Sequence, residues 1–130
     1  MNTVSFLLLR LAIGASMFGH GLVRMPKLSG FSAWMVGNFE KSILPKAMVV
    51  PFSYALPIAE LVIGLFVLIG LFTKASLIAG GAVMAILIFG TTTIENWEAI
   101  TSQLVHAAFF GVLLHFVESN GYSVDGMLRR

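Results

Sequence analysis

The chain has 130 residues, of which 58% are hydrophobic and only 11% are charged, whereas a soluble domain carries roughly 25% charged residues. This composition excludes an ordinary soluble domain and indicates a membrane protein, while the eight basic residues are too evenly spread to predict binding of nucleic acid. The chain has no cysteine, which excludes disulfide bonds, thiolate metal sites and a dithiol relay of its own.

Four segments are long and apolar enough to cross a membrane, which takes roughly 20 residues for about 30 Å of hydrocarbon. They cover approximately residues 3–23, 49–72, 75–94 and 100–117. Backbone groups in lipid must form their hydrogen bonds internally, and no alternating pattern indicates strands, so we predict four helices. The short connections after the second and third segments make neighbouring helices antiparallel. We therefore predict an all-α membrane protein, a four-transmembrane-helix bundle that forms a single domain over residues 1–130.

The connection between the first two segments, residues 25–48, has a helical pattern of its own. Apolar residues recur at helical spacing and form one face, which comprises Leu28, Phe31, Met35 and Phe39. Ser32 should point to another face, and Pro45 should end the helix. We predict an amphipathic helix at the membrane interface, with a soluble docking surface as the alternative.

Three ionisable residues of the predicted spans fall at similar depths. At a rise of 1.5 Å per residue, His20, Glu60 and His106 all lie in the outer half of the membrane. A histidine beside a carboxyl group suits proton exchange at neutral pH, so we predict that these three residues form a catalytic group. Gly19 and Gly21 flank His20 and should let the first helix approach a neighbour closely there.

Three further polar residues are candidates for binding a ligand in the same half of the bundle. Arg24 follows His20 by about one turn and can attract an anionic or polar group. Ser53 shares a face with Glu60, and Gln103 shares a face with His106. Pro57 should bend the second helix just before Glu60, which favours a pocket.

Arg10 has a competing structural interpretation. It interrupts the first apolar run and no basic residue precedes it, which argues against a removable signal peptide. A charge at the centre of a span costs roughly 2.5 to 3.5 kcal/mol, so Arg10 and Glu60 must pair, neutralise or face the interior. Their expected depths differ by roughly 5 Å, which two long side chains can bridge. An Arg10–Glu60 ion pair that braces the first two helices is therefore the alternative to a functional Glu60.

Three stretches of the sequence resemble recurrent blocks of a known protein family. They read LRLAIGASMFGHGLVRM at residues 9–25, AELVIGLFVLIGLFTKASL at residues 59–77, and ESNGYSVDGMLRR at residues 118–130. In this order they resemble the DoxX family of small bacterial membrane proteins, whose members usually carry lysine where Arg24 stands. The resemblance implies a four-helix bundle associated with oxidoreductase systems, including thiosulfate and quinone metabolism in some relatives.

Two functions follow as hypotheses. The first is a membrane subunit of a quinone- or thiosulfate-linked redox system, with a polar pocket for a small apolar or quinone-like ligand and a partner oxidoreductase or a second copy of the chain. The second is a non-catalytic scaffold or chaperone whose polar residues only lock the bundle. Four short spans give little support to a transporter. No motif predicts a metal site, and His20 with His106 is weak evidence for haem.

Localisation follows from the same features. The spans imply a multi-pass protein in contact with membrane lipids, and the resemblance implies the bacterial plasma membrane with both termini in the cytoplasm. The positive-inside rule does not decide the orientation, because Lys74, Arg129 and Arg130 on one side face four basic residues on the other.

Overall fold

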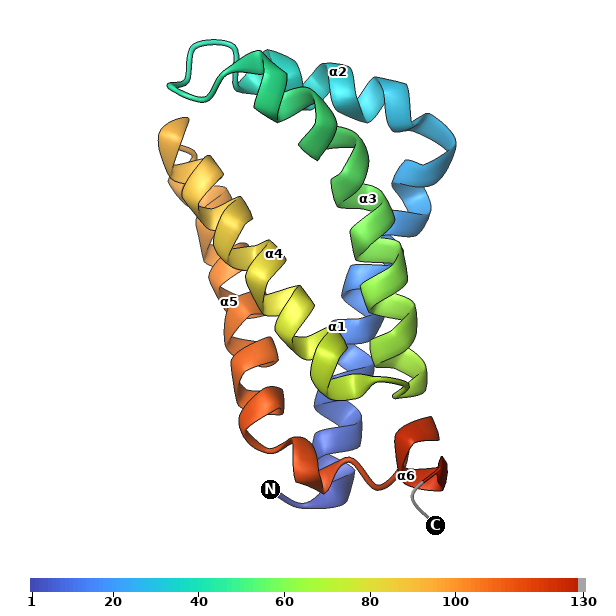
Figure 1. The fold of residues 1–130 in the computed structure, drawn as a ribbon. Coiled ribbons are helices and arrows are strands. Elements are labelled where there is room, and N and C mark those ends of the chain that lie inside the picture. The colour runs from blue at the N-terminus through green and yellow to red at the C-terminus, as the bar shows by residue number, and fades with distance from the viewer. Residues whose placement is uncertain (129–130) are drawn as a thin grey trace.

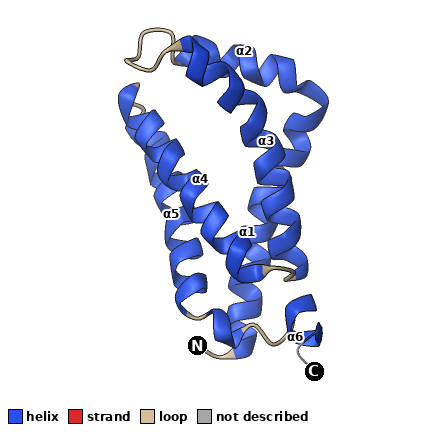
Figure 2. Cartoon of the chain, viewed as in Figure 1, coloured by secondary structure: helices blue, strands red, loops and turns tan. Residues whose placement is uncertain are grey.

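The computed structural model describes residues 1–128, so Arg129 and Arg130 lie outside the described residues. All regular structure within 1–128 is helical (Figures 1 and 2). The elements in chain order are α1 (Thr3–Arg24), η1 (Met25–Lys27), α2 (Leu28–Asn38), α3 (Lys46–Ile69), α4 (Thr73–Thr93), α5 (Trp97–His115), η2 (Val117–Ser119) and α6 (Val124–Leu128).

Four of these helices, α1, α3, α4 and α5, are long and apolar enough to span a membrane, which confirms the predicted all-α bundle. Capping residues determine where these helices begin and end. The Asn2 side chain accepts a hydrogen bond from the Ser5 N–H at the start of α1, and Asn96 does the same for Ala99 in α5. Gly70 ends α3 in the left-handed conformation, with φ of 72°, which a glycine adopts without steric cost.

The helices form two antiparallel pairs, α1 with α3 and α4 with α5 (Figure 1). Glycines bring α1 and α3 together, because a Cβ at Gly21 would meet the Leu61 backbone and one at Gly64 would meet the Phe18 backbone. The predicted close approach beside His20 is therefore confirmed for Gly21. It is wrong for Gly19, where a Cβ would meet nothing.

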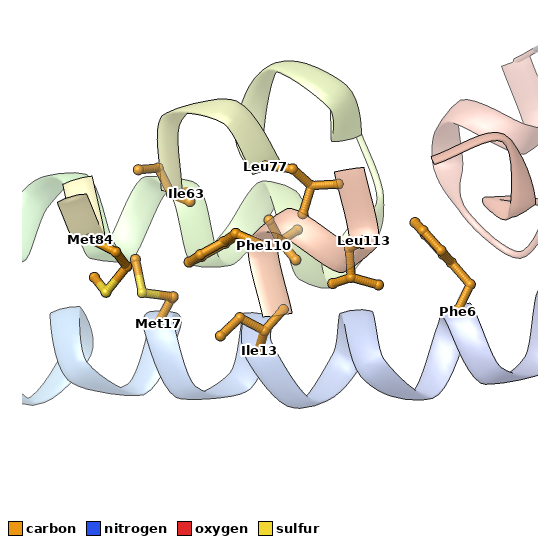
Figure 3. Close-up of a cluster of buried hydrophobic side chains, with 9 residues drawn as sticks. Phe6, Ile13, Met17, Ile63, Leu77, Met84, Phe110 and Leu113 are labelled. Carbon is orange, nitrogen blue, oxygen red and sulfur yellow. The ribbon is translucent and has the colours of Figure 1, made fainter. Parts of the chain in front are cut away.

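The main core lies where the two pairs meet (Figure 3). All four long helices contribute to it, and its fully buried side chains include Phe6 and Met17 from α1, Val67 from α3, Leu77 from α4 and Phe110 from α5. Gly80 leaves the space that the Phe110 ring occupies. The core thus holds the pairs together on the side of the bundle that carries the termini.

Helix α2 crosses the opposite end of the bundle and packs on the first half of α3 (Figure 1). Two details of the predicted connection are wrong. The helix ends at Asn38, and Pro45 instead precedes the first residue of α3. Ser32 is buried rather than directed away, because it lies one turn from Met35 on the face that contacts α3. Placement of α2 at the membrane interface stays a prediction.

The chain after α5 folds back beneath the turn between α3 and α4. The Asp125 carboxylate accepts hydrogen bonds from the backbone N–H groups of Phe72 and Thr73, at 2.9 and 2.7 Å. The Asn120 amide donates to the Thr73 hydroxyl at 2.8 Å. We call this group of contacts the terminal clamp, because it ties the C-terminal segment to the start of α4.

Candidate functional site

A cavity of about 200 Å³ lies between the helix pairs, on the α2 side of the core. Residues from α1, α3, α4 and α5 line it. The polar ones are His20, Arg24, Glu60, Ser102, Gln103 and His106, and the apolar ones include Met17, Met84 and Leu87. We call this cavity the polar pocket.

Glu60 and Arg24 form an ion pair in this pocket. The Arg24 Nη1 donates to Glu60 Oε1 at 2.7 Å, and Glu60 is only 4% exposed. Helical side chains tilt toward the helix N-terminus, so Arg24 reaches back from the end of α1 toward Glu60. Its guanidinium also lies 4.4 Å from the ring centre of Phe31 in α2, a cation–π contact that ties α2 to the pocket.

Arg10 does not pair with Glu60, so the predicted Arg10–Glu60 ion pair is wrong. Arg10 is buried and donates to Asn120 Oδ1 at 2.9 Å and to the Leu68 carbonyl at 3.5 Å. The register of α1 against α3 explains the error. Gly21 lies against Leu61, close to Glu60 in sequence, and Arg10 precedes Gly21 by eleven residues, a separation of roughly 16 Å along the helix. Arg10 therefore belongs with the terminal clamp.

His20 and His106 face each other across the pocket. Their ring centres are 5.9 Å apart, with the rings nearly perpendicular. His20 Nδ1 lies 2.6 Å from the Ser16 carbonyl, and His106 Nδ1 lies 2.8 Å from the Ser102 carbonyl. A carbonyl oxygen only accepts, so both Nδ1 atoms carry a proton, and in the neutral form of each ring the lone pair is on Nε2.

Ser16 links the two histidines. Its carbonyl accepts from His20, and its hydroxyl lies 2.7 Å from His106 Nε2. Within residues 1–128, His20 Nε2 has no hydrogen-bond partner, and the His20 side chain is open at the edge of the bundle. The pocket therefore offers one unoccupied imidazole nitrogen that can accept a hydrogen bond from a ligand.

Two of the predicted ligand-binding residues, Gln103 and Ser53, lie in different regions of the structure. Gln103 lines the pocket, donates to the Thr91 hydroxyl at 3.0 Å, and leaves its buried Oε1 without a partner among the described residues. Ser53 does not line the pocket. It is fully buried, donates to the Val50 carbonyl, and lies 2.6 Å from the Ser32 hydroxyl of α2. Ser53 thus joins α2 to α3 instead of facing a ligand.

Sequence reasoning missed Ser16, whose hydroxyl lies 2.7 Å from His106 Nε2. Helical geometry places a backbone carbonyl one turn before each histidine whatever the residue type, so the carbonyl contacts of His20 and His106 do not require serine. The contact of the Ser16 hydroxyl with His106 joins two helices and depends on how α1 packs against α5, which no local pattern signals.

The described residues contain no group of three or more acidic, histidine or cysteine side chains arranged to hold a metal ion. The ion pair, the two histidines and the Gln103 amide give the pocket donors and acceptors for a polar group, next to a buried carboxyl group that can exchange a proton.

Comparison with known proteins gives one family. The sequence model described as DoxX matches residues 5–95. This range includes His20, Arg24 and Glu60 and ends before His106 and before Asn120 and Asp125 of the terminal clamp. A search of curated proteins and a search of solved structures each found no match.

Proposed function

The chain belongs to the DoxX family, and we propose that it is an integral membrane subunit of a redox system that binds a quinone-like ligand in the polar pocket. The family resemblance supports the redox link, which some relatives have to quinone or thiosulfate metabolism. The four apolar helices support a ligand drawn from the membrane itself. A partner oxidoreductase would supply or take up the electrons.

One observation carries this proposal. An almost fully buried carboxyl group, Glu60, shares a cavity with two histidines that have Nε2 lone pairs. A quinone takes up one proton for each electron on reduction, and the quinol gives these protons back on oxidation. His20 Nε2 can accept a hydrogen bond from a quinol hydroxyl, and Glu60 or His106 can receive or supply the proton. Arg24 and Gln103 would orient the headgroup.

The test is a binding measurement on purified protein in mild detergent. Native mass spectrometry with decylubiquinone should show a bound ligand in the wild type. His20→Ala, Glu60→Gln and His106→Ala should each bind at least about tenfold less, as expected for loss of a hydrogen bond to a charged or polar group. His115→Ala is the matched control, because His115 lies outside the pocket beside Phe116. Binding at the wild-type level in all four variants would overturn the proposal.

A scaffold or chaperone is the second candidate, and the pairing inside the pocket favours it. Arg24 bonds to Glu60, Gln103 to Thr91, and His106 to Ser16, so these groups also lock the bundle without any ligand. A scaffold predicts that the pocket variants lose thermal stability and partner binding together, and that no quinone binds.

We further propose that the protein lies in the bacterial plasma membrane with both termini in the cytoplasm. Met1 and α6 lie at the same end of the bundle, where Ser119 donates to the Met1 carbonyl at 2.7 Å (Figure 1). Ile43 and Met127 are both strongly exposed. A single cysteine introduced at one of these positions should react with an impermeant thiol reagent in intact cells, and a single cysteine at the other should not. We expect labelling at 43 but not at 127, and the opposite pattern would reverse the orientation.

A further inference from the structure

A second cavity adjoins the polar pocket. It has a volume of about 210 Å³ and lies between α2, the loop that follows it, the first half of α3 and the second half of α4. Its walls are apolar and include Met35, Phe39, Leu44, Phe52, Leu87 and Gly90. We call it the apolar groove.

Leu87 lies between the two cavities, because it lines both the apolar groove and the polar pocket. Along α4, the hydrogen-bonding groups of the pocket are therefore followed directly by a purely apolar wall. This sequence of surfaces matches a molecule with a polar head and a hydrocarbon chain. A compact water-soluble substrate would leave the groove empty.

We propose that the apolar groove holds the hydrocarbon chain of a single-chain amphiphile whose polar head occupies the polar pocket. The inference rests on the proposed function in that it places the head among His20, Glu60 and His106. It adds the substrate class, which is a headgroup carrying one linear isoprenoid or acyl chain. The chain would enter from the membrane, so that head and chain never leave an apolar or hydrogen-bonding environment.

The size of the groove supports one chain. An apolar cavity of about 150 Å³ holds a benzene-sized guest, so about 210 Å³ accepts several methylene groups of a single chain. Together, the two cavities reach the lower part of the roughly 300–1,000 Å³ range of small-molecule sites.

Gly90 keeps the groove open. A Cβ placed at Gly90 would lie 3.5 Å from the Phe39 ring and 4.0 Å from Leu44, which is ordinary contact distance. A larger side chain at this position would extend into the groove between α4 and the α2 loop. Gly90→Leu is thus a means of filling the groove without touching any hydrogen-bonding group of the polar pocket.

The experiment compares three probes by native mass spectrometry in mild detergent. They are decylubiquinone, the same benzoquinone headgroup without its decyl chain, and dodecanoate. The proteins are wild type, Gly90→Leu and the matched control Gly111→Leu, whose new side chain meets open space on α5. Thermal melting of each variant verifies that it remains folded.

We expect the wild type to bind decylubiquinone more tightly than the bare headgroup. Gly90→Leu should lower decylubiquinone binding about tenfold, a typical effect of changing the volume of an apolar pocket, and leave the bare headgroup unchanged. Gly111→Leu should bind like the wild type.

Each other result is decisive. If both quinones bind equally and Gly90→Leu has no effect, the groove does not hold the chain, although the proposed function stands. If neither quinone binds, the proposed function fails, and dodecanoate decides the inference. Binding of dodecanoate to the wild type and its loss in Gly90→Leu would assign the site to an acyl lipid. Equal binding in both proteins, or no binding to either, would overturn the inference.

Discussion

The polar pocket and the terminal clamp each contain an arginine from α1, half-buried in the pocket and fully buried in the clamp, but they use it differently. Arg10 donates to the Asn120 side chain and to the Leu68 carbonyl, and so joins α1 to α3 and to the C-terminal segment. Arg24 pairs with Glu60 at the wall of a cavity. In the clamp the polar groups connect chain segments to one another. In the pocket they also face a space that a ligand can occupy.

This difference shows how a small bundle can hold ionisable groups in a membrane for two purposes. An arginine is tolerated in both places because hydrogen-bonding oxygens lie within reach. The consequences of substitution should differ, however. Changes in the clamp should lower stability alone, whereas changes in the pocket should alter ligand binding. The following predictions test this contrast.

The largest effect is expected for the Arg24–Glu60 ion pair. Removing one partner of a buried pair typically costs roughly 3–5 kcal/mol, because an uncompensated charge stays behind, whereas replacing both costs little. Arg24→Leu should therefore lower stability by about 3 kcal/mol, near the lower end of that range, because the Arg24 side chain is 26% exposed. The double variant Arg24→Leu/Glu60→Leu should recover most of the loss. Thermal melting in detergent measures this, and additive losses would mean that the pair contributes no coupling.

A smaller effect is expected at the glycines beside His20. In Gly21→Ala the new methyl group meets the Leu61 backbone, so α1 and α3 must separate, at a typical cost of about 1–3 kcal/mol. Gly19→Ala meets nothing and should gain roughly 0.5–1 kcal/mol from helix propensity. Melting of the two variants should shift in opposite directions. A loss of equal size in both would show that helix separation at Gly21 is unimportant.

The smallest effect is expected in the terminal clamp. Asp125→Ala removes the acceptor for two backbone N–H groups at the start of α4, and loss of such a helix cap typically costs about 0.5–2 kcal/mol. Decylubiquinone binding should stay at the wild-type level, because the clamp does not line the pocket. Glu118→Ala, an exposed acid in the same segment, is the matched control. If Asp125→Ala weakened binding as strongly as His20→Ala does, the two regions would not be separable.

Sequence reasoning brought His20, Glu60 and His106 together correctly because rise per residue converts position into depth. The same arithmetic failed for Arg10. It could not see the register of α1 against α3, which places Gly21 against Leu61 and so brings Arg24 to Glu60.

Ser53 and Ser32 illustrate a second limit. Helical periodicity placed Ser53 on the face of Glu60, and that face is indeed buried. The helical period does not say which neighbouring helix covers that face of α3. Helix α2 folds across the first half of α3, so that Ser53 meets Ser32 and the pocket begins one to two turns further along, at Glu60.

The sequence by itself determined the membrane class and the four helices, because lipid forces every backbone hydrogen bond into the helix and the apolar runs have the length of a bilayer. Only the tertiary structure decided that Arg24 pairs with Glu60, that Arg10 joins the terminal clamp, and that an apolar groove adjoins the polar pocket at Leu87. These features depend on how far α1 slides along α3 before Gly21 and Gly64 meet opposing backbone. That distance is set by the packing of two surfaces against each other, and neither helix encodes it alone.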